Sequence, residues 1–272
     1  MKKYLSILFA FILFLTGWCG KSVPAAYDDK NIVSCSVSKD KDCISNVNGK
    51  ETNDVDNTEE FLNDLKQYKT IGSTISDFPI VMQMPELPTG CEITALTMIL
   101  QYYGFPAEKT SLAFEYLPTV PSDFYYDDSG NMYGPDLREY FVGDPSTIGG
   151  FVCGTGAICV AADSYLAEQE SDLRAVDISG RSPEALYELI DENIPVLVWV
   201  TIEMADRRQT QGWYTASGEY VEWSTNDHGA VLIGYDEETV TIADPISGEV
   251  KYDRAQFEKV FSDRGSQCVI LQ

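Results

Sequence analysis

Histidine is the scarcest chemistry-bearing residue of this sequence, with one copy in 272 residues. Zinc and copper sites commonly use several imidazoles, so a multi-histidine metal site cannot form within one chain and would need cysteine and carboxylate ligands instead. A single imidazole is still sufficient for one catalytic dyad with a nucleophile. We therefore expect no metal and no cofactor. If the histidine is catalytic, we expect it to act with one nucleophilic side chain.

Basic residues are also few, with 19 Lys and Arg against 43 Asp and Glu, a formal charge of -24 and a pI near 4.2. Affinity for DNA or RNA depends mainly on Lys and Arg contacts with phosphates, so nucleic acid is excluded as a partner. Neutral or basic peptides remain as partners. A composition with 44% hydrophobic and 12% aromatic residues predicts a folded domain with a substantial core. The sequence does not indicate the oligomeric state.

Long uncharged apolar runs are missing except at the N-terminus, where Lys2 and Lys3 precede the run Tyr4–Trp18. This pattern is typical of a secretory signal peptide, and the run is shorter than the roughly 20 residues of a membrane span. The small side chains of Val23 and Ala25 suit a cleavage site, so we assign residues 1–26 to the signal. Lipidation at Cys19 is the alternative. We expect a bacterial protein that is secreted or at the cell surface, without an integral membrane domain after signal removal.

Residues 27–75 contain many acidic and polar residues and few large apolar ones. Such a composition buries too little surface to offset the entropy of ordering, so we predict a largely disordered acidic linker, with a short helix at residues 59–68. Cys35 and Cys43 lie within it and could form a local disulfide or remain free thiols. The periodic sequence that follows predicts one domain over residues 76–272.

Cys91 stands at the predicted beginning of a mostly buried helix that ends near Gly104. Thr89 and Glu92 have the spacing of a capping box, which would place the Cys91 thiol in the first helical turn. The positive end of the helix dipole favours a thiolate there, and the free backbone amides can receive a developing oxyanion. A small buried apolar residue is the alternative interpretation of Cys91.

His228 begins an apolar strand-like run that is joined by a short polar loop to a second run ending at Asp244. If Gly234 pairs with Glu238 across this hairpin, His228 and Asp244 face each other on one side of the sheet. Asp227 and Asp236 are rival carboxylates. Asp227 would point to the opposite face and Asp236 belongs to the turn, so Asp244 is the better orienting group.

The segments Gln83–Glu92, His228–Asp236 and Ala243–Gly248 resemble the bacteriocin-processing (double-glycine leader) cysteine peptidases of the papain-like superfamily. The sequence is most similar to their stand-alone exported members, over most of residues 78–250. The resemblance implies that Cys91 is the nucleophile, His228 the general base and acid, Asp244 its orienting partner, and Gln83 a side-chain donor to the oxyanion. Transporter-fused members carry further domains that this chain lacks, so their leader-peptide substrate is not implied.

Three other features have ordinary structural interpretations. The oxygen-rich segment at residues 127–131 is predicted to form a hairpin turn, because it lacks the glycine and the distal glutamate of a helix–loop–helix calcium site. Cys153 and Cys159 have no second pair at zinc spacing and are expected to form a disulfide or to be free thiols, and Cys268 has no assignable partner. A set of aromatic residues, which we call the aromatic cluster, is predicted either to line a peptide groove or to pack in the core. Its members are Phe124, Tyr125, Tyr126, Trp199, Trp213, Tyr214 and Trp223.

The order of the predicted elements indicates an α+β papain-like fold, with the cysteine helix packed against an antiparallel sheet that carries the histidine and aspartate. We predict an exported cysteine peptidase that hydrolyses peptide or isopeptide bonds through an acyl-enzyme intermediate. A cell-wall peptide amidase or transpeptidase with the same triad is one alternative. A papain-like domain that binds peptides at the cell surface without catalysis is the other.

Overall fold

The main body of the protein is built on one antiparallel sheet. The computed structural model describes residues 72–272. The strands of the sheet are β1 (Gly72–Thr74), β6 (Ala175–Asp177), β7 (Val196–Thr201), β10 (Asp227–Asp236), β11 (Thr239–Asp244), β12 (Gly248–Asp253) and β13 (Cys268–Leu271). They lie in the order β12-β11-β10-β7-β13-β6, and β1 pairs with β10. The central position of β10, the histidine strand, explains why eight of its residues in succession are buried.

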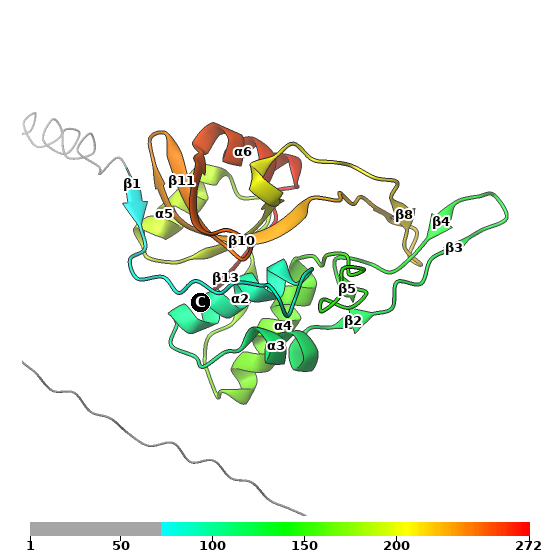
Figure 1. The fold of residues 1–272 in the computed structure, drawn as a ribbon, viewed down its shortest axis with the longest axis horizontal. Helices are drawn as coiled ribbons and strands as arrows, with labels where there is room; N and C mark the ends of the chain where they lie inside the picture. The colour runs from blue at the N-terminus through cyan, green and yellow to red at the C-terminus, as the bar shows by residue number, and fades with distance from the viewer. Residues whose placement is uncertain (1–71) are drawn as a thin grey trace, which may run out of the picture. The chain divides into compact units, whose positions relative to one another are not determined.

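Helices cover both faces of this sheet (Figure 1). Helices α2 (Cys91–Tyr102) and α4 (Thr155–Glu168) lie below it in that view, and α5 (Pro183–Asp191) and α6 (Arg254–Asp263) lie above. The short helix α3 (Lys109–Ser111) continues into a π-helical turn at Leu112–Tyr116. Because both faces are covered, all six residues of β7 are buried, and Trp199 lies at its centre. The resulting core holds α2 rigidly against β10.

A second, smaller sheet projects from the body on the right of Figure 1. Its strands are β3 (Tyr125–Tyr126), β4 (Met132–Tyr133), β8 (Trp213–Tyr214) and β9 (Tyr220–Val221), in the order β3-β4-β8-β9. We call this four-stranded sheet, together with its turns, the arm. One of its faces packs on a separate apolar cluster that includes Trp213, Val221 and Val152. Beside it, β2 (Thr119–Val120) and β5 (Phe141–Val142) form a two-stranded parallel pair.

The observed elements agree with the predicted fold class, because helices pack against an antiparallel sheet and the cysteine helix adjoins the histidine strand. The turn predicted at residues 127–131 is confirmed: an Asp127 carboxylate oxygen accepts hydrogen bonds from the backbone N–H groups of Ser129 and Asn131. The boundary of the linker needs a correction, since β1 lies inside residues 27–75 and pairs with β10. The remaining linker features, namely the 59–68 helix, Cys35 and Cys43, lie outside the described residues, as do the signal peptide and Cys19.

No helix in residues 72–272 combines the length and apolarity needed to cross a membrane.

Candidate active site

Cys91 is the first residue of α2, as the sequence predicts, but the helix begins without the expected capping box. Gly90 is the N-cap, and no side chain caps the helix. The Thr89 hydroxyl instead donates to the carbonyl oxygens of Thr147 at 3.0 Å and Pro145 at 3.4 Å. These acceptors are more than fifty residues away in the sequence, so tertiary contacts replace the local cap. The capping-box prediction is therefore wrong, although the position of the thiol in the first turn is right.

Glu92 lies beneath the thiol instead of turning back toward the cap. Its side chain is almost completely buried, at 1% exposure, and its Oε2 accepts a hydrogen bond from Cys91 Sγ at 3.2 Å. Its Oε1 accepts from the backbone N–H of Cys153 at 3.2 Å. Gly229 of β10 packs directly on it, because a Cβ added there would lie 2.7 Å from Glu92 Cγ. Glu92 therefore joins the cysteine helix to the histidine strand, a role that local sequence patterns do not reveal.

This environment controls the ionisation of both groups. Burial and the neighbouring Glu92 carboxylate raise the pKa of the Cys91 thiol well above its ordinary value, although the backbone N–H of Gly229 acts against them. Burial also raises the pKa of Glu92, although hydrogen bonds from backbone N–H groups and from Cys91 oppose it. Burial and the Glu92 carboxylate thus favour the protonated form of the thiol. The predicted stabilisation of the thiolate by the helix terminus is outweighed by desolvation and by Glu92.

His228 and Asp244 are brought together on adjacent strands. His228 is 1% exposed, and its Nε2 lies 3.1 Å from Asp244 Oδ2, within ion-pair distance. The Asp244 carboxylate also accepts backbone N–H bonds from Ile246 and Ser247. Burial tends to raise the pKa of Asp244, but the contact with His228 and these two N–H groups outweigh it and leave the pKa lowered. Asp244 is therefore ionised beside the imidazole at neutral pH.

The strand register differs from the predicted one. Gly234 pairs with Thr241 instead of Glu238, and a bulge between Leu232 and Gly234 shifts the register by one residue. Beyond the bulge, Val231 faces Ala243, so the continued register places Ala230 opposite Asp244. His228 lies two residues farther along the same face and meets Asp244 diagonally. The predicted pair forms, but by a different geometry.

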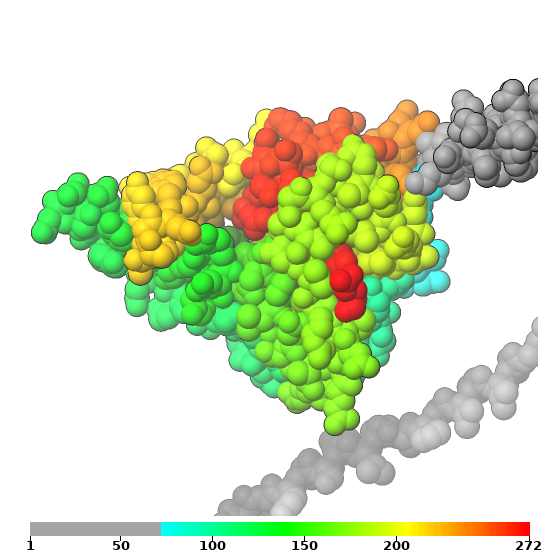
Figure 2. Space-filling view, turned by 180° about the vertical axis from the view of Figure 1, so that it is seen from behind, coloured from blue at the N-terminus to red at the C-terminus, as the bar shows by residue number. Residues whose placement is uncertain are grey.

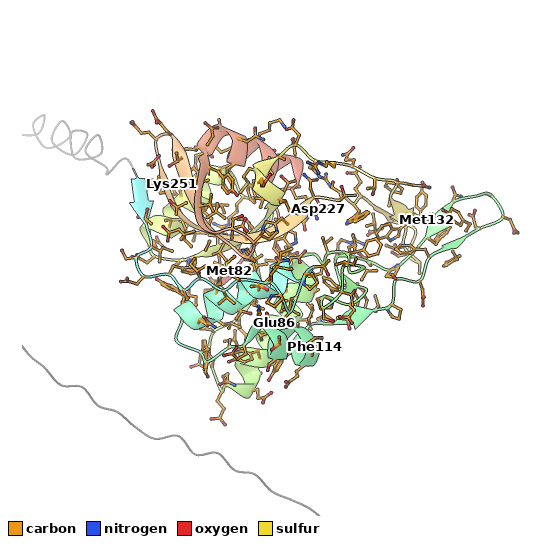
Figure 3. All side chains as sticks on the ribbon, in the orientation of Figure 1. Met82, Glu86, Phe114, Met132, Asp227 and Lys251 are labelled. Carbon is orange, nitrogen blue, oxygen red and sulfur yellow. The ribbon has the colours of Figure 1, made fainter. Side chains whose placement is uncertain are left out.

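The two rival carboxylates serve the fold. Asp227, labelled in Figure 3, is buried, and its Oδ1 lies 2.9 Å from Arg264 Nε. Asp236 holds the β10–β11 turn by accepting the backbone N–H groups of Glu238 and Thr239. Asp244 alone of these three acids is in contact with the ring of His228.

Gln83 lies in the loop that approaches the site from β1. Its backbone N–H donates to Pro245 O at 2.8 Å, which places it next to the aspartate segment. The side chain is 3% exposed; Nε2 donates to Pro88 O at 2.9 Å, and Oε1 is buried without a hydrogen-bond partner. Lys109 holds this loop by donating to the carbonyl oxygen of Gln83 and to the carboxylate of Glu86. One N–H of the Gln83 amide therefore remains for a ligand.

Cys91, His228 and Gln83 line one cavity of about 270 Å³. Two of its walls come from segments in which the sequence indicates only Trp223, as a member of the aromatic cluster. Ile148, Phe151 and Val152 contribute to one wall, and Trp223 and Thr225 contribute to the other. The rings of Phe151 and Trp223 are in contact, with centroids 4.8 Å apart. Of the predicted aromatic cluster, Trp223 thus lines the groove, whereas Trp199 and Trp213 are core residues.

The other cysteines of residues 72–272 are free thiols, so Cys153 and Cys159 do not form a disulfide. Cys153 is buried behind Cys91, whereas Cys159 is partly exposed on α4. Within the described chain, no group of three or more His, Cys, Asp or Glu side chains is arranged to hold a metal ion.

Comparison with known proteins gives consistent matches. The model of the Peptidase_C39 like family matches residues 75–269. Uncharacterized protein YvpB of Bacillus subtilis (strain 168) is 33% identical over 192 residues, which cover 70% of this chain and 72% of that protein. A crystal structure from Bacillus anthracis described as a C39-like peptidase is 34% identical, with a TM-score of 0.64, over 74% of this chain and 97% of the other. The peptidase domain of Streptococcus ComA is 14% identical, with a TM-score of 0.40, over 71% of this chain and 97% of that domain.

Proposed function

Because the chain belongs to the Peptidase_C39 like family of cysteine peptidases, we propose that it hydrolyses peptide or isopeptide bonds with a Cys91–His228–Asp244 triad. The observation that carries the proposal is the contact of 3.1 Å between His228 and Asp244 beside the cavity that Cys91 also lines. The buried, ionised carboxylate of Asp244 lies within ion-pair distance of His228 Nε2. Neither ring nitrogen makes a hydrogen bond among the described residues, and Nδ1, the nitrogen that does not contact Asp244, is available as the proton acceptor.

In the first half of the reaction, His228 Nδ1 takes the proton of Cys91 Sγ as the sulfur attacks the carbonyl carbon of the substrate. The oxygen of that carbonyl becomes an oxyanion, which the backbone N–H of Cys91 and the free amide N–H of Gln83 stabilise. The imidazolium, held by Asp244, then gives its proton to the leaving amine as the carbon–nitrogen bond breaks. The acyl group remains on Sγ as a thioester.

In the second half, a water molecule attacks the thioester carbon while His228 accepts one of its protons. The carbon–sulfur bond breaks, and the proton returns from His228 to Sγ. The products are a carboxylic acid and the resting thiol. During this cycle Sγ must leave its hydrogen bond with Glu92, because that bond holds the thiol proton away from the imidazole.

Labelling of the thiol tests this proposal directly. We expect a peptidyl chloromethyl ketone to alkylate Cys91 in preference to Cys159, which is the partly exposed control thiol in the same chain. Cys159 does not line the cavity that contains His228, the only histidine of the sequence, so it lacks an imidazole to accept its proton. We expect His228→Ala to slow labelling of Cys91 and leave Cys159 unchanged. Equal labelling of the two thiols, independent of His228, would refute the triad.

Hydrolysis of a mixed library of fluorogenic peptides separates an enzyme from a binding domain. We expect Cys91→Ala to remove all cleavage while peptide binding persists. Cleavage that survives in Cys91→Ala would place the nucleophile elsewhere.

We also propose that the protein is exported, because Lys2 and Lys3 precede an uncharged run that is too short for a membrane span. Expression of the full sequence in a Gram-positive host, followed by mass spectrometry of the mature N-terminus, tests this. Cleavage after Ala25 supports a signal peptide, and a diacylglyceryl group on Cys19 supports a lipoprotein. An intact Met1 in the purified protein would exclude both.

A further inference from the structure

A row of tyrosines crosses the exposed face of the arm. Tyr125 of β3 is paired with Tyr133 of β4, Tyr133 with Tyr214 of β8, and Tyr214 with Tyr220 of β9. Residues directly opposite each other on neighbouring strands point to the same face, and successive ring centroids are 5.3, 5.8 and 5.1 Å apart. The four rings therefore form one continuous aromatic row.

The two ends of the row are open to solvent, with Tyr125 59% exposed and Tyr220 53% exposed. The other face of the sheet is packed at β8 and β9, where Trp213 and Val221 are buried in the apolar cluster. In Figure 2, the tip of β3–β4 (green) and the β8–β9 segment (gold) extend side by side away from the body. Large exposed aromatic patches of this kind mark interaction surfaces.

The charge around the row is strongly acidic. Asp123, Asp128, Glu219 and Glu222 are exposed on the arm or its flanks. Two basic groups lie beside them: Arg138 is paired with the carboxylates of Asp136 and Glu219, and Arg207 lies 3.7 Å from the carboxylate of Glu222. The acidic character of this surface therefore depends mainly on Asp123 and Asp128. Aromatic rings together with carboxylates attract Lys and Arg side chains, whose cations bind to the rings and whose stems cover apolar surface. Anionic partners are repelled by the same surface.

The arm is physically continuous with the wall of the catalytic cavity. Phe151 and Trp223 line that cavity, and the ring of Phe151 also contacts Trp213 of the arm, with centroids 5.9 Å apart. The packed face of the arm therefore adjoins the wall of the cavity, and the tyrosine row lies on the opposite face of the same small sheet.

We propose that the tyrosine row of the arm is a docking site for a Lys- or Arg-rich segment of the peptide substrate. Identification of the bound peptide as a substrate rests on the proposed function, whereas the docking itself does not. Tyr125, Tyr214 and the flanking acids Asp123 and Asp128 are the residues that recognise the cations.

Binding to the full chain with Cys91→Ala tests this without hydrolysis. The probes are a fluorescein-labelled peptide of repeated Lys-Gly-Ser and a matched peptide of repeated Glu-Gly-Ser, followed by fluorescence anisotropy at low and moderate salt. We expect the lysine peptide to bind and the glutamate peptide not to bind. Tyr125→Ala and Tyr214→Ala should each weaken binding about two- to fivefold, and Tyr125→Phe, which keeps the ring, should retain it.

Two charge variants separate recognition by the arm from general attraction to an acidic protein. Asp123→Asn with Asp128→Asn should weaken binding and reduce its salt dependence. Asp172→Asn with Glu237→Gln, which removes the same charge elsewhere on the surface, should leave both unchanged. Equal effects of the two double variants, or binding that ignores the tyrosine substitutions, would overturn the proposal. Binding of a neutral N-acetylglucosamine oligomer in preference to the lysine peptide would also overturn it.

Failure of this proposal is distinguishable from failure of the proposed function. The urea midpoint and the circular dichroism spectrum of Tyr125→Ala should match those of the unmodified chain, which shows that the variant is folded. If the arm binds the lysine peptide but Cys91 is unreactive in the unmodified chain, the docking site stands and the triad fails. If Cys91 is reactive and peptides are cleaved but the arm variants bind normally, the docking site fails alone.

Discussion

Replacement of Glu92 by glutamine should activate the Cys91 thiol, and the size of the effect should depend on pH. Glutamine has the same shape and can keep the contact with Cys153 N–H through its carbonyl oxygen. Its amide nitrogen donates a hydrogen bond, so it stabilises a thiolate where the glutamate carboxylate repels one. The change therefore isolates the charge of Glu92 from its packing.

The magnitude follows from the contact between Cys91 Sγ and Glu92 Oε2. At 3.2 Å, two unit charges repel by about 5 kcal/mol at an effective dielectric constant of about 20. Glu92 carries that charge only above its own raised pKa. We therefore expect the ratio of iodoacetamide alkylation rates, Glu92→Gln over unmodified protein, to rise with pH through that pKa. The rise should exceed about tenfold, because even one third of that repulsion is worth more than a factor of ten.

Stopped-flow or quenched alkylation between pH 5 and 9, with Cys91 identified by mass spectrometry, measures this ratio. Glu115→Gln, an exposed glutamate in the π-helical turn, is the matched control and should follow the unmodified protein at every pH. A ratio that is independent of pH, or below one, would refute the idea that Glu92 restrains the thiol.

The same substitution has a consequence for stability. Burial raises the folded-state pKa of Glu92 above the ordinary value of a glutamate. Its contribution to stability is complete below that value and is lost as pH rises through the raised pKa. Glu92→Gln lacks this loss, so its free energy of unfolding should exceed that of the unmodified protein at neutral pH. Urea denaturation at pH 5 and pH 8 should show the difference growing with pH; a difference that shrinks would contradict the linkage.

Three further substitutions test the site and its support. Asp244→Asn should lower kcat about 10²- to 10⁴-fold with little change in the urea midpoint, because it removes the charge that steadies the imidazolium; unchanged kcat would remove Asp244 from the triad. Gly229→Ala should lower the free energy of unfolding by about 1–3 kcal/mol and slow Cys91 labelling, because the new Cβ would lie 2.7 Å from Glu92 Cγ. In the control Gly149→Ala, the new Cβ meets no atom closer than 3.7 Å, so the free energy of unfolding should change little. Leu96→Ala in α2, where the side chain is fully buried, should lower the free energy of unfolding by about 2–5 kcal/mol. Phe114→Ala, at a position that is 61% exposed, should change it by no more than about 0.5 kcal/mol.

The sequence is most informative where structure is decided locally. The apolar run after Cys91 and the two runs around His228 and Asp244 have enough periodicity to predict α2, β10 and β11, and thereby the α+β architecture. The capping box fails because the best partners of the Thr89 hydroxyl belong to the loop around Pro145, which no local pattern can identify. The sequence places Trp223 in the aromatic cluster that could line a peptide groove, but it does not reveal the partner Phe151, because the two rings meet only through the fold.

The β10 bulge shows how a single residue decides whether the predicted pair can form. Next to the turn, Tyr235 faces Val240 and Gly234 faces Thr241; if this register continued, Val231 would face Asp244 and His228 would lie on the opposite side of the sheet. Ile233 is the extra residue that shifts the register and returns His228 to the face of Asp244. The Ile233 carbonyl accepts the backbone N–H of Ile75 just after β1, so a segment assigned to the linker stabilises the bulge. The linear sequence contains both the histidine and the aspartate, but their contact depends on a backbone irregularity that only pairing with a distant strand explains.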